Sequence, residues 1–121
     1  MALIRALSGG GGGGDTGVQR WTNPSPTQAF NSQLIEFDMT NVAYIVIEQC
    51  RQTVEQNTRS MGTINYGSGG RSVTVDTYNS GGYRTGRSYT ANSSGVTVGN
   101  ALYGDGNAAA IPLQIVVISA V

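Results

Sequence analysis

The chain has 121 residues, with seven arginines and no lysine balanced by seven acidic residues, and it contains no histidine and one cysteine. This length fits one domain, and the zero net charge argues against a nucleic-acid-binding protein or one that inserts at an anionic membrane, since both need basic excess. Only 12% of the residues are charged. The surface must therefore consist largely of Ser, Thr, Asn, Gln, Gly and Tyr, which suits a protein that joins an assembly or faces sugars.

Residues 1–29 are predicted to form an N-terminal anchor and a glycine-rich, extended arm. Residues 1–7 look like a small anchor, and Gly9–Gly14 is a run of six glycines. Such a run is typical of a flexible linker. The alternative is that three copies pack side by side as extended left-handed helices, because only glycine allows so close an approach. In the polar connector that follows, Trp21 is expected to cover an edge of the core.

From residue 30 onward the pattern is that of β-strands. Residues 34–39 alternate apolar and acidic side chains, which predicts a half-buried strand, and residues 42–50 form a more deeply buried one. The two strands either lie in different layers or pair as a hairpin. Residues 51–59 favour a strand and a loop over a helix, because no apolar stripe has helical spacing. A third, weaker strand is expected over residues 60–66.

Two strands then flank a clear turn. Residues 71–78 and 83–91 surround Asn79-Ser-Gly-Gly82, whose residue types tolerate the backbone angles of a tight turn. Another turn precedes a short strand at residues 96–98. About seven or eight short strands separated by turns predict an all-β, antiparallel sandwich of jelly-roll type over residues 30–121.

The last stretch, residues 111–121, is nearly apolar and follows a predicted loop over residues 99–110. Its many β-branched residues predict a strand in the middle of the fold. Gln114 interrupts one face of this strand, and Val116 and Ile118 then make that face apolar as well. We expect neighbouring strands or another subunit to cover it.

No catalytic constellation is present in the sequence. Without histidine there is no Ser-His or Cys-His pair, and Glu36 and Asp38 lie on the predicted solvent face of a strand. Cys50 reads as a small buried hydrophobe. Gly9–Gly14 lacks the Gly-Lys-Ser/Thr ending of a phosphate-binding loop. We expect no enzyme activity, no cofactor and no metal site.

The best candidates for ligand binding are tyrosines and arginines in or beside the predicted loops. Tyrosine rings stack on sugar rings, and arginine bonds hydroxyl or acidic groups, so these residues could form a glycan site. The alternative is that the tyrosines pack at strand edges and that the arginines pair with acidic residues or a neighbouring subunit. The candidates are Tyr66, Tyr78, Tyr83, Arg84, Arg87 and Tyr103.

The order of several motifs carries a family resemblance. The succession FDMTNVAYIVIEQC, RSVTVDTY and YRTGRSYTANSSGVTVGNA, followed by AIPLQIVVISAV, resembles a C-terminal β-sandwich domain of bacteriophage tail, baseplate and fibre proteins. The most specific parts are Gly95 to Asn100 and Ile111 to Ile115. Members often end in I-x-G-I after the last motif, whereas this chain continues with Val116-Val-Ile-Ser119.

This resemblance implies a structural component of a phage or phage-tail-like particle: a small fibre, baseplate or decoration protein. It implies a homotrimer that contacts other particle proteins through its N-terminal arm and takes part in attachment to a host surface, with a glycan as the possible ligand. The first residues contain no stretch long enough for a signal peptide, so we expect synthesis in a bacterial cytoplasm without Sec export. The alternative function is a free-standing carbohydrate-binding module.

Overall fold

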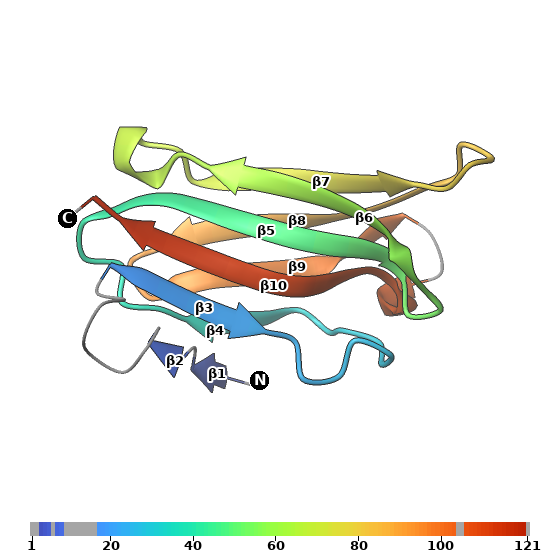
Figure 1. The fold of residues 1–121 in the computed structure, drawn as a ribbon, viewed down its shortest axis with the longest axis horizontal. Coiled ribbons are helices and arrows are strands. Elements are labelled where there is room, and N and C mark those ends of the chain that lie inside the picture. Colours follow the sequence, from blue (N-terminus) through green and yellow to red (C-terminus); the bar gives the residue numbers. More distant parts are fainter. Residues whose placement is uncertain (1–2, 6, 9–16, 104–105, 121) are drawn as a thin grey trace.

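The structure, a computed structural model, describes residues 3–5, 7–8, 17–103 and 106–120, and these residues form two β-sheets packed face to face (Figure 1). Two short 3-10 turns lie between strands: η2 (Tyr66–Ser68) precedes the strand that starts at Ser72, and η3 (Gly106–Ala108) precedes the last strand. The strands are β1 (Leu3–Arg5), β2 (Leu7–Ser8), β3 (Val18–Thr22), β4 (Gln33–Glu36), β5 (Val42–Gln52), β6 (Glu55–Ile64), β7 (Ser72–Tyr78), β8 (Arg84–Asn92), β9 (Gly95–Tyr103) and β10 (Ala109–Ser119).

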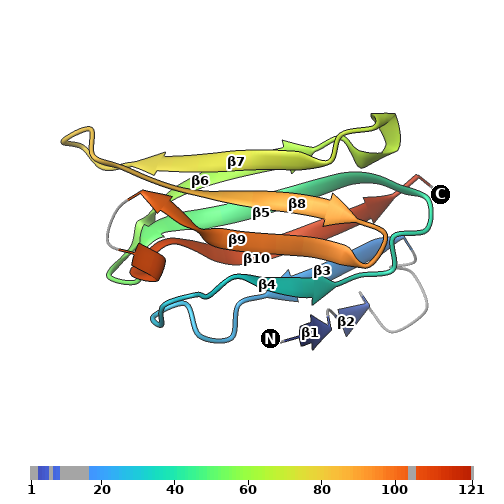
Figure 2. The same ribbon diagram turned by 180° about the vertical axis from the view of Figure 1, so that it is seen from behind.

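The sheets have the strand orders β1-β4-β9-β8-β7 and β2-β3-β10-β5-β6, which confirms the predicted β-sandwich. Early strands lie beside late ones, as in a jelly roll: β3 pairs with β10 in one sheet, and β4 pairs with β9 in the other (Figure 2). Strands β4 and β5 therefore lie in different layers. This was one of the two arrangements that the sequence left open, and the other, a hairpin of these two strands, is wrong.

Strand β10 occupies the middle of its sheet, between β3 and β5, as its apolar sequence predicted. It begins at Ala109, slightly earlier than expected. Ile115 lies in register with Trp21 on one side and Ile47 on the other, and its side chain has no exposed surface. Val116 and Ile118 point to the other face and are half-buried. The core thus lies on the Ile115 side of this strand.

Residues 15–29 were predicted to form an extended connector, but Val18–Thr22 within this range form strand β3, so the prediction is wrong there. Strand β3 is hydrogen-bonded along β10, so the sandwich starts before residue 30. Trp21 is only 4% exposed, and its ring meets the Phe30 ring edge to face at 5.7 Å between centroids. The strand escaped prediction because Trp21 is its single large inward-facing apolar residue. Gly9–Gly14 lies outside the described residues.

The described part of the N-terminal segment lies along the sandwich, whereas the sequence predicted an anchor held apart from it. Strand β1 pairs in parallel with β4, and β2 pairs antiparallel with β3. These short strands add to one edge of each sheet (Figure 1). They hydrogen-bond backbone groups that an edge strand would otherwise leave open.

Two strands extend further than the sequence indicated. β6 starts at Glu55 and forms a hairpin with β5 around a turn at Thr53 and Val54, which confirms strand and loop over helix. β9 continues to Tyr103, so the loop before β10 is shorter than predicted. β6 is an edge strand whose less exposed residues include Thr58, Ser60, Gly62 and Ile64, so its sequence lacks the apolar alternation by which strands are recognised.

A buried hydrogen-bond network joins the two sheets. The Gln49 amide on β5 donates to the Val75 carbonyl at 2.9 Å and to the Thr77 hydroxyl at 3.0 Å on β7, and it accepts from the Tyr89 hydroxyl on β8 at 2.8 Å. Burial raises the pKa of Tyr89, so its hydroxyl stays protonated and remains a donor. Both the nitrogen and the oxygen of the Gln49 amide are hydrogen-bonded, and these bonds fix how the two sheets align.

Gly95, at the start of β9, makes a close backbone contact that only glycine permits. Its φ is +143°, and a Cβ there would lie 2.1 Å from the Ile35 carbonyl oxygen on β4. We expect Gly95→Ala to lower the free energy of unfolding by at least about 2 kcal/mol in urea denaturation. Gly69→Ala is the matched control, because its φ is +97° but nothing lies within 4 Å of the added carbon. Equal losses for both variants would contradict the close contact.

Candidate functional site

Three predicted site residues lie together on the β7–β8 hairpin: Tyr78, Tyr83 and Arg84, here called the hairpin patch. Tyr78 is 51% exposed and Tyr83 is 70% exposed. Tyr78 and Arg84 are cross-strand partners at the end of the hairpin. The loop is shaped by Asn79, whose side-chain oxygen accepts hydrogen bonds from the amides of Gly81 at 2.9 Å and Tyr83 at 3.0 Å. The patch is thus accessible and is presented on a defined turn.

Tyr103 lies next to this patch but is not a free stacking platform. The Arg84 guanidinium lies over its ring, 3.8 Å from the centroid. Gly86 lets the ring lie against the sheet, since a Cβ there would be 2.5 Å from a Tyr103 ring carbon. Arg84 is also 3.8 Å from the Asp76 carboxylate. Tyr103 and Asp76 therefore position Arg84, and one face of the Tyr103 ring is already occupied.

The prediction that Arg87 contacts a surface ligand is wrong, because its side chain is fully buried. Its guanidinium donates to backbone carbonyls of three separate segments. The acceptors are Ala110 O at 2.7 Å, Phe30 O at 2.8 Å, Gly99 O at 2.7 Å, Ala109 O at 2.9 Å and Asn107 O at 3.5 Å. We call this arrangement the Arg87 clamp.

The Arg87 clamp neutralises a buried cation with carbonyl dipoles. Burial lowers the pKa of Arg87 from its ordinary value, which is so high that the side chain remains charged at neutral pH. The Phe30 ring centroid lies 5.7 Å from the guanidinium carbon. Because the five acceptors lie on the segment before β4, on β9 and on the segment entering β10, Arg87 holds these three parts of the chain together.

Tyr66 is far from the other candidates. It begins η2, at the opposite end of the sandwich from the β7–β8 hairpin (Figure 1). The Arg71 guanidinium lies over its ring at 4.3 Å, and Arg71 also donates to the Tyr66 carbonyl at 3.2 Å. One face of the Tyr66 ring is therefore covered by Arg71, a contact that the sequence did not predict.

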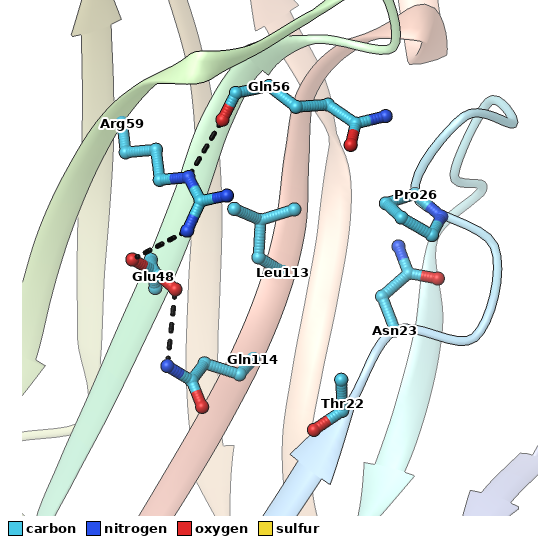
Figure 3. Close-up of a pocket in the computed structure, with 8 residues that line it drawn as sticks. All are labelled: Thr22, Asn23, Pro26, Glu48, Gln56, Arg59, Leu113 and Gln114. Atoms are coloured by element: carbon cyan, nitrogen blue, oxygen red, sulfur yellow. Dashed lines mark hydrogen bonds and ion pairs between the residues drawn. The ribbon is translucent and has the colours of Figure 1, made fainter.

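A pocket of about 310 Å³ lies on the outer face of the sheet that contains β10, where the sequence indicated no site. Four separate segments contribute to it, so no contiguous motif could have revealed it. Its floor is formed by strands β10 and β5, and its rims by the loop after β3 and by β6 (Figure 3). The lining residues are Thr22, Asn23, Pro26, Glu48, Gln56, Arg59, Leu113 and Gln114.

Other kinds of site were also sought in the described part of the chain. Within residues 3–5, 7–8, 17–103 and 106–120, no three His, Cys, Asp or Glu side chains gather closely enough to hold a metal ion. Across the same residues, no helix has the length and apolarity needed to span a membrane. Cys50 is buried, and this burial raises the pKa of its thiol, as expected for a packed hydrophobe.

The chain was compared with known proteins at the level of families, sequences and structures. No family model, curated protein or solved structure matches it. The likeness to phage β-sandwich domains thus rests on the sequence motifs alone and stays a prediction.

Proposed function

We propose that this protein is a structural component of a bacteriophage or phage-tail-like particle, assembled as a homotrimer and involved in attachment to a host surface. The motif order of the sequence supports this proposal, and so does the β-sandwich fold. The observation that carries the proposal is a difference between the outer faces of the two sheets. One of them is polar, and the other presents aliphatic and aromatic side chains.

The outer face of the β10 sheet contains a continuous apolar strip, formed by Val18, Tyr44, Val46, Val116 and Ile118. In the strand register, Ile118 lies between Val18 and Tyr44, and Val116 lies beside Val46. Tyr44 is 51% exposed, and the other four are half-buried. Apolar side chains gathered on one surface are typical of a protein interface.

The outer face of the β7–β8–β9 sheet has the opposite character. Each of the three strands has outward residues that carry hydroxyl groups, and Thr74 and Ser88 hydrogen-bond to each other at 3.1 Å. Thr90 lies in register with Ser72 on one side and Thr97 on the other. This polar face can remain in water, whereas the apolar strip gains free energy when another surface covers it.

Further copies of the same chain suit the apolar strip best. The chain has no net charge, so identical copies approach without long-range repulsion. One charged residue borders the strip, the exposed Arg20, which lies in register with Val116. In the proposed trimer the strips of three copies face their neighbours, which covers β10 around Val116 and Ile118 and leaves the β7–β8 hairpin at one end of the particle component.

The assembly is tested by adding a charge to the apolar strip. Val46→Arg places a guanidinium in the middle of the strip, and we expect it to convert the trimer into a folded monomer. Thr74→Arg adds the same charge to the polar outer face and should leave the trimer intact. Sedimentation velocity measures both. Identical sedimentation of the two variants would remove the support for this interface.

A free-standing carbohydrate-binding module is the second candidate function. The exposed tyrosines and arginine of the hairpin patch favour it, because such side chains stack on and hydrogen-bond to sugars. This candidate requires no self-association. The oligomeric state therefore separates the two functions, and an attachment protein would combine trimer formation with sugar binding.

A further inference from the structure

We propose that the pocket on the outer face of the β10 sheet binds one neutral sugar ring. The inference deepens the attachment part of the proposed function, by assigning a ligand class and a site away from the hairpin patch. At about 310 Å³ the pocket is at the lower end of the range for small-molecule sites, which fits a single ring better than an extended chain.

A chain of hydrogen bonds across four strands orients the polar groups of the pocket. Arg20 on β3 donates to the Gln114 side-chain oxygen at 2.7 Å. The Gln114 amide nitrogen must then face the other way, where it donates to Glu48 on β5 at 3.1 Å. On the far side, Arg59 of β6 approaches the second Glu48 oxygen at 3.5 Å (Figure 3).

Glu48 and Arg59 retain hydrogen-bonding capacity that a ligand can use. The Arg59 Nε donates to the Gln56 carbonyl at 2.7 Å, which holds the guanidinium over the pocket. Its contact with Glu48 is long, and its second terminal nitrogen makes no hydrogen bond to the described residues. A carboxylate beside a guanidinium offers an acceptor and donors at neighbouring positions. Two adjacent hydroxyls of a sugar ring match this arrangement.

The remaining lining is suited to the carbon skeleton of a sugar ring. Leu113 projects into the pocket between Arg59 and Pro26, and Pro26 belongs to the loop after β3 (Figure 3). The Asn23 side chain stabilises this loop, because it donates to the Pro112 carbonyl at 2.9 Å and accepts from the Ser25 amide at 2.8 Å. The apolar wall is therefore held in place opposite the polar one.

The charges of the pocket select for a neutral ligand. The lining contains one carboxylate, Glu48, and one guanidinium, Arg59, which cancel each other. Because Glu48 and Arg59 are in contact, the carboxylate of an acidic sugar on Arg59 would also lie close to Glu48, and an amine on Glu48 would also lie close to Arg59. Both pairings are unfavourable at a partly desolvated site. A ring whose polar groups are hydroxyls avoids both penalties.

Binding is tested by NMR titration of the full chain with the methyl glycosides of glucose, galactose, mannose and N-acetylglucosamine, and with sialic acid as the acidic comparison. We expect at least one neutral glycoside to shift the amide resonances around Glu48 and Leu113, and sialic acid to leave them unchanged. Glu48→Gln and Arg59→Gln should each weaken that binding about tenfold, the effect of losing one charge-assisted hydrogen bond.

Arg84→Gln probes the hairpin patch separately. Arg71→Gln is the matched control, because Arg71 is an exposed arginine that lies outside both the pocket and the hairpin patch. It should leave the affinity unchanged. Thr22→Tyr, at an exposed strand position, should block the pocket without removing a polar group. Spectra of the free variants show whether each is folded.

The proposal is overturned if no glycoside shifts the pocket resonances, if sialic acid binds in preference, or if Arg84→Gln alone reduces affinity. The last result would place the sugar on the hairpin patch. Trimer formation is measured separately by sedimentation, so a loss of the sugar site leaves the assembly proposal standing, and the reverse also holds.

Discussion

Arg87→Met is expected to lower the free energy of unfolding by at least about 3 kcal/mol. Methionine has a similar length but no donor, so the carbonyls of Phe30, Gly99, Ala109 and Ala110 would lose a buried hydrogen-bond partner. Each unsatisfied buried acceptor is costly, and here several lie around one side chain. Guanidinium denaturation of the purified variant, followed by circular dichroism, measures the loss.

Two further variants isolate the contribution of the Arg87 clamp. Arg87→Lys keeps the charge but replaces a planar fork of five donors by a point charge, so it should recover only part of the stability. Arg84→Met removes an arginine whose side chain is 43% exposed and should cost less than about 1 kcal/mol. If Arg87→Met is no more destabilising than Arg84→Met, the clamp does not support the fold as argued.

Ile115→Asp should abolish folding. Ile115 is fully buried in the central strand β10, between Trp21 and Ile47, and belongs to the hydrophobic core that fills the space between the sheets. A carboxylate there would have to be protonated or left unpaired in the core. We expect an insoluble product, or a chain whose amide spectrum lacks the dispersion of a folded protein.

The adjacent position provides the control. Val116 points to the outer face and is only half-buried, so Val116→Asp should remain folded although it places a charge in the apolar strip. A soluble, dispersed Ile115→Asp would show that the core face of β10 has been misassigned. Failure of both variants would mean that the outer face is also essential for the fold.

The parts of the fold that the sequence predicted are those with a period of two and clear turns. The β7–β8 hairpin was predicted by the Asn79-Ser-Gly-Gly82 turn, and β10 by its apolar run, because burial on one or both faces dictates residue type directly. Strands β3 and β6 were missed or shortened. Too few large apolar side chains mark their inner faces.

The site was harder to predict than the fold. Thr85, Arg87 and Tyr89 occupy every second position of β8, and all three point inward. This spacing is visible in the sequence, but an arginine in a polar segment is ordinarily exposed. Its partners are backbone carbonyls, which leave no trace in residue type. Tyr78, Tyr83 and Arg84 lie together because they flank one turn. The pocket residues come together only through the pairing of β3, β10, β5 and β6.

We propose that the apolar strip on the β10 sheet joins copies of this chain into a trimer. Light scattering of the wild-type protein during size-exclusion chromatography, repeated over a range of micromolar concentrations, tests it most directly. For the proposed trimer we expect a mass three times that of the 12.6-kDa chain. A folded protein that remains at 12.6 kDa throughout that range would contradict it.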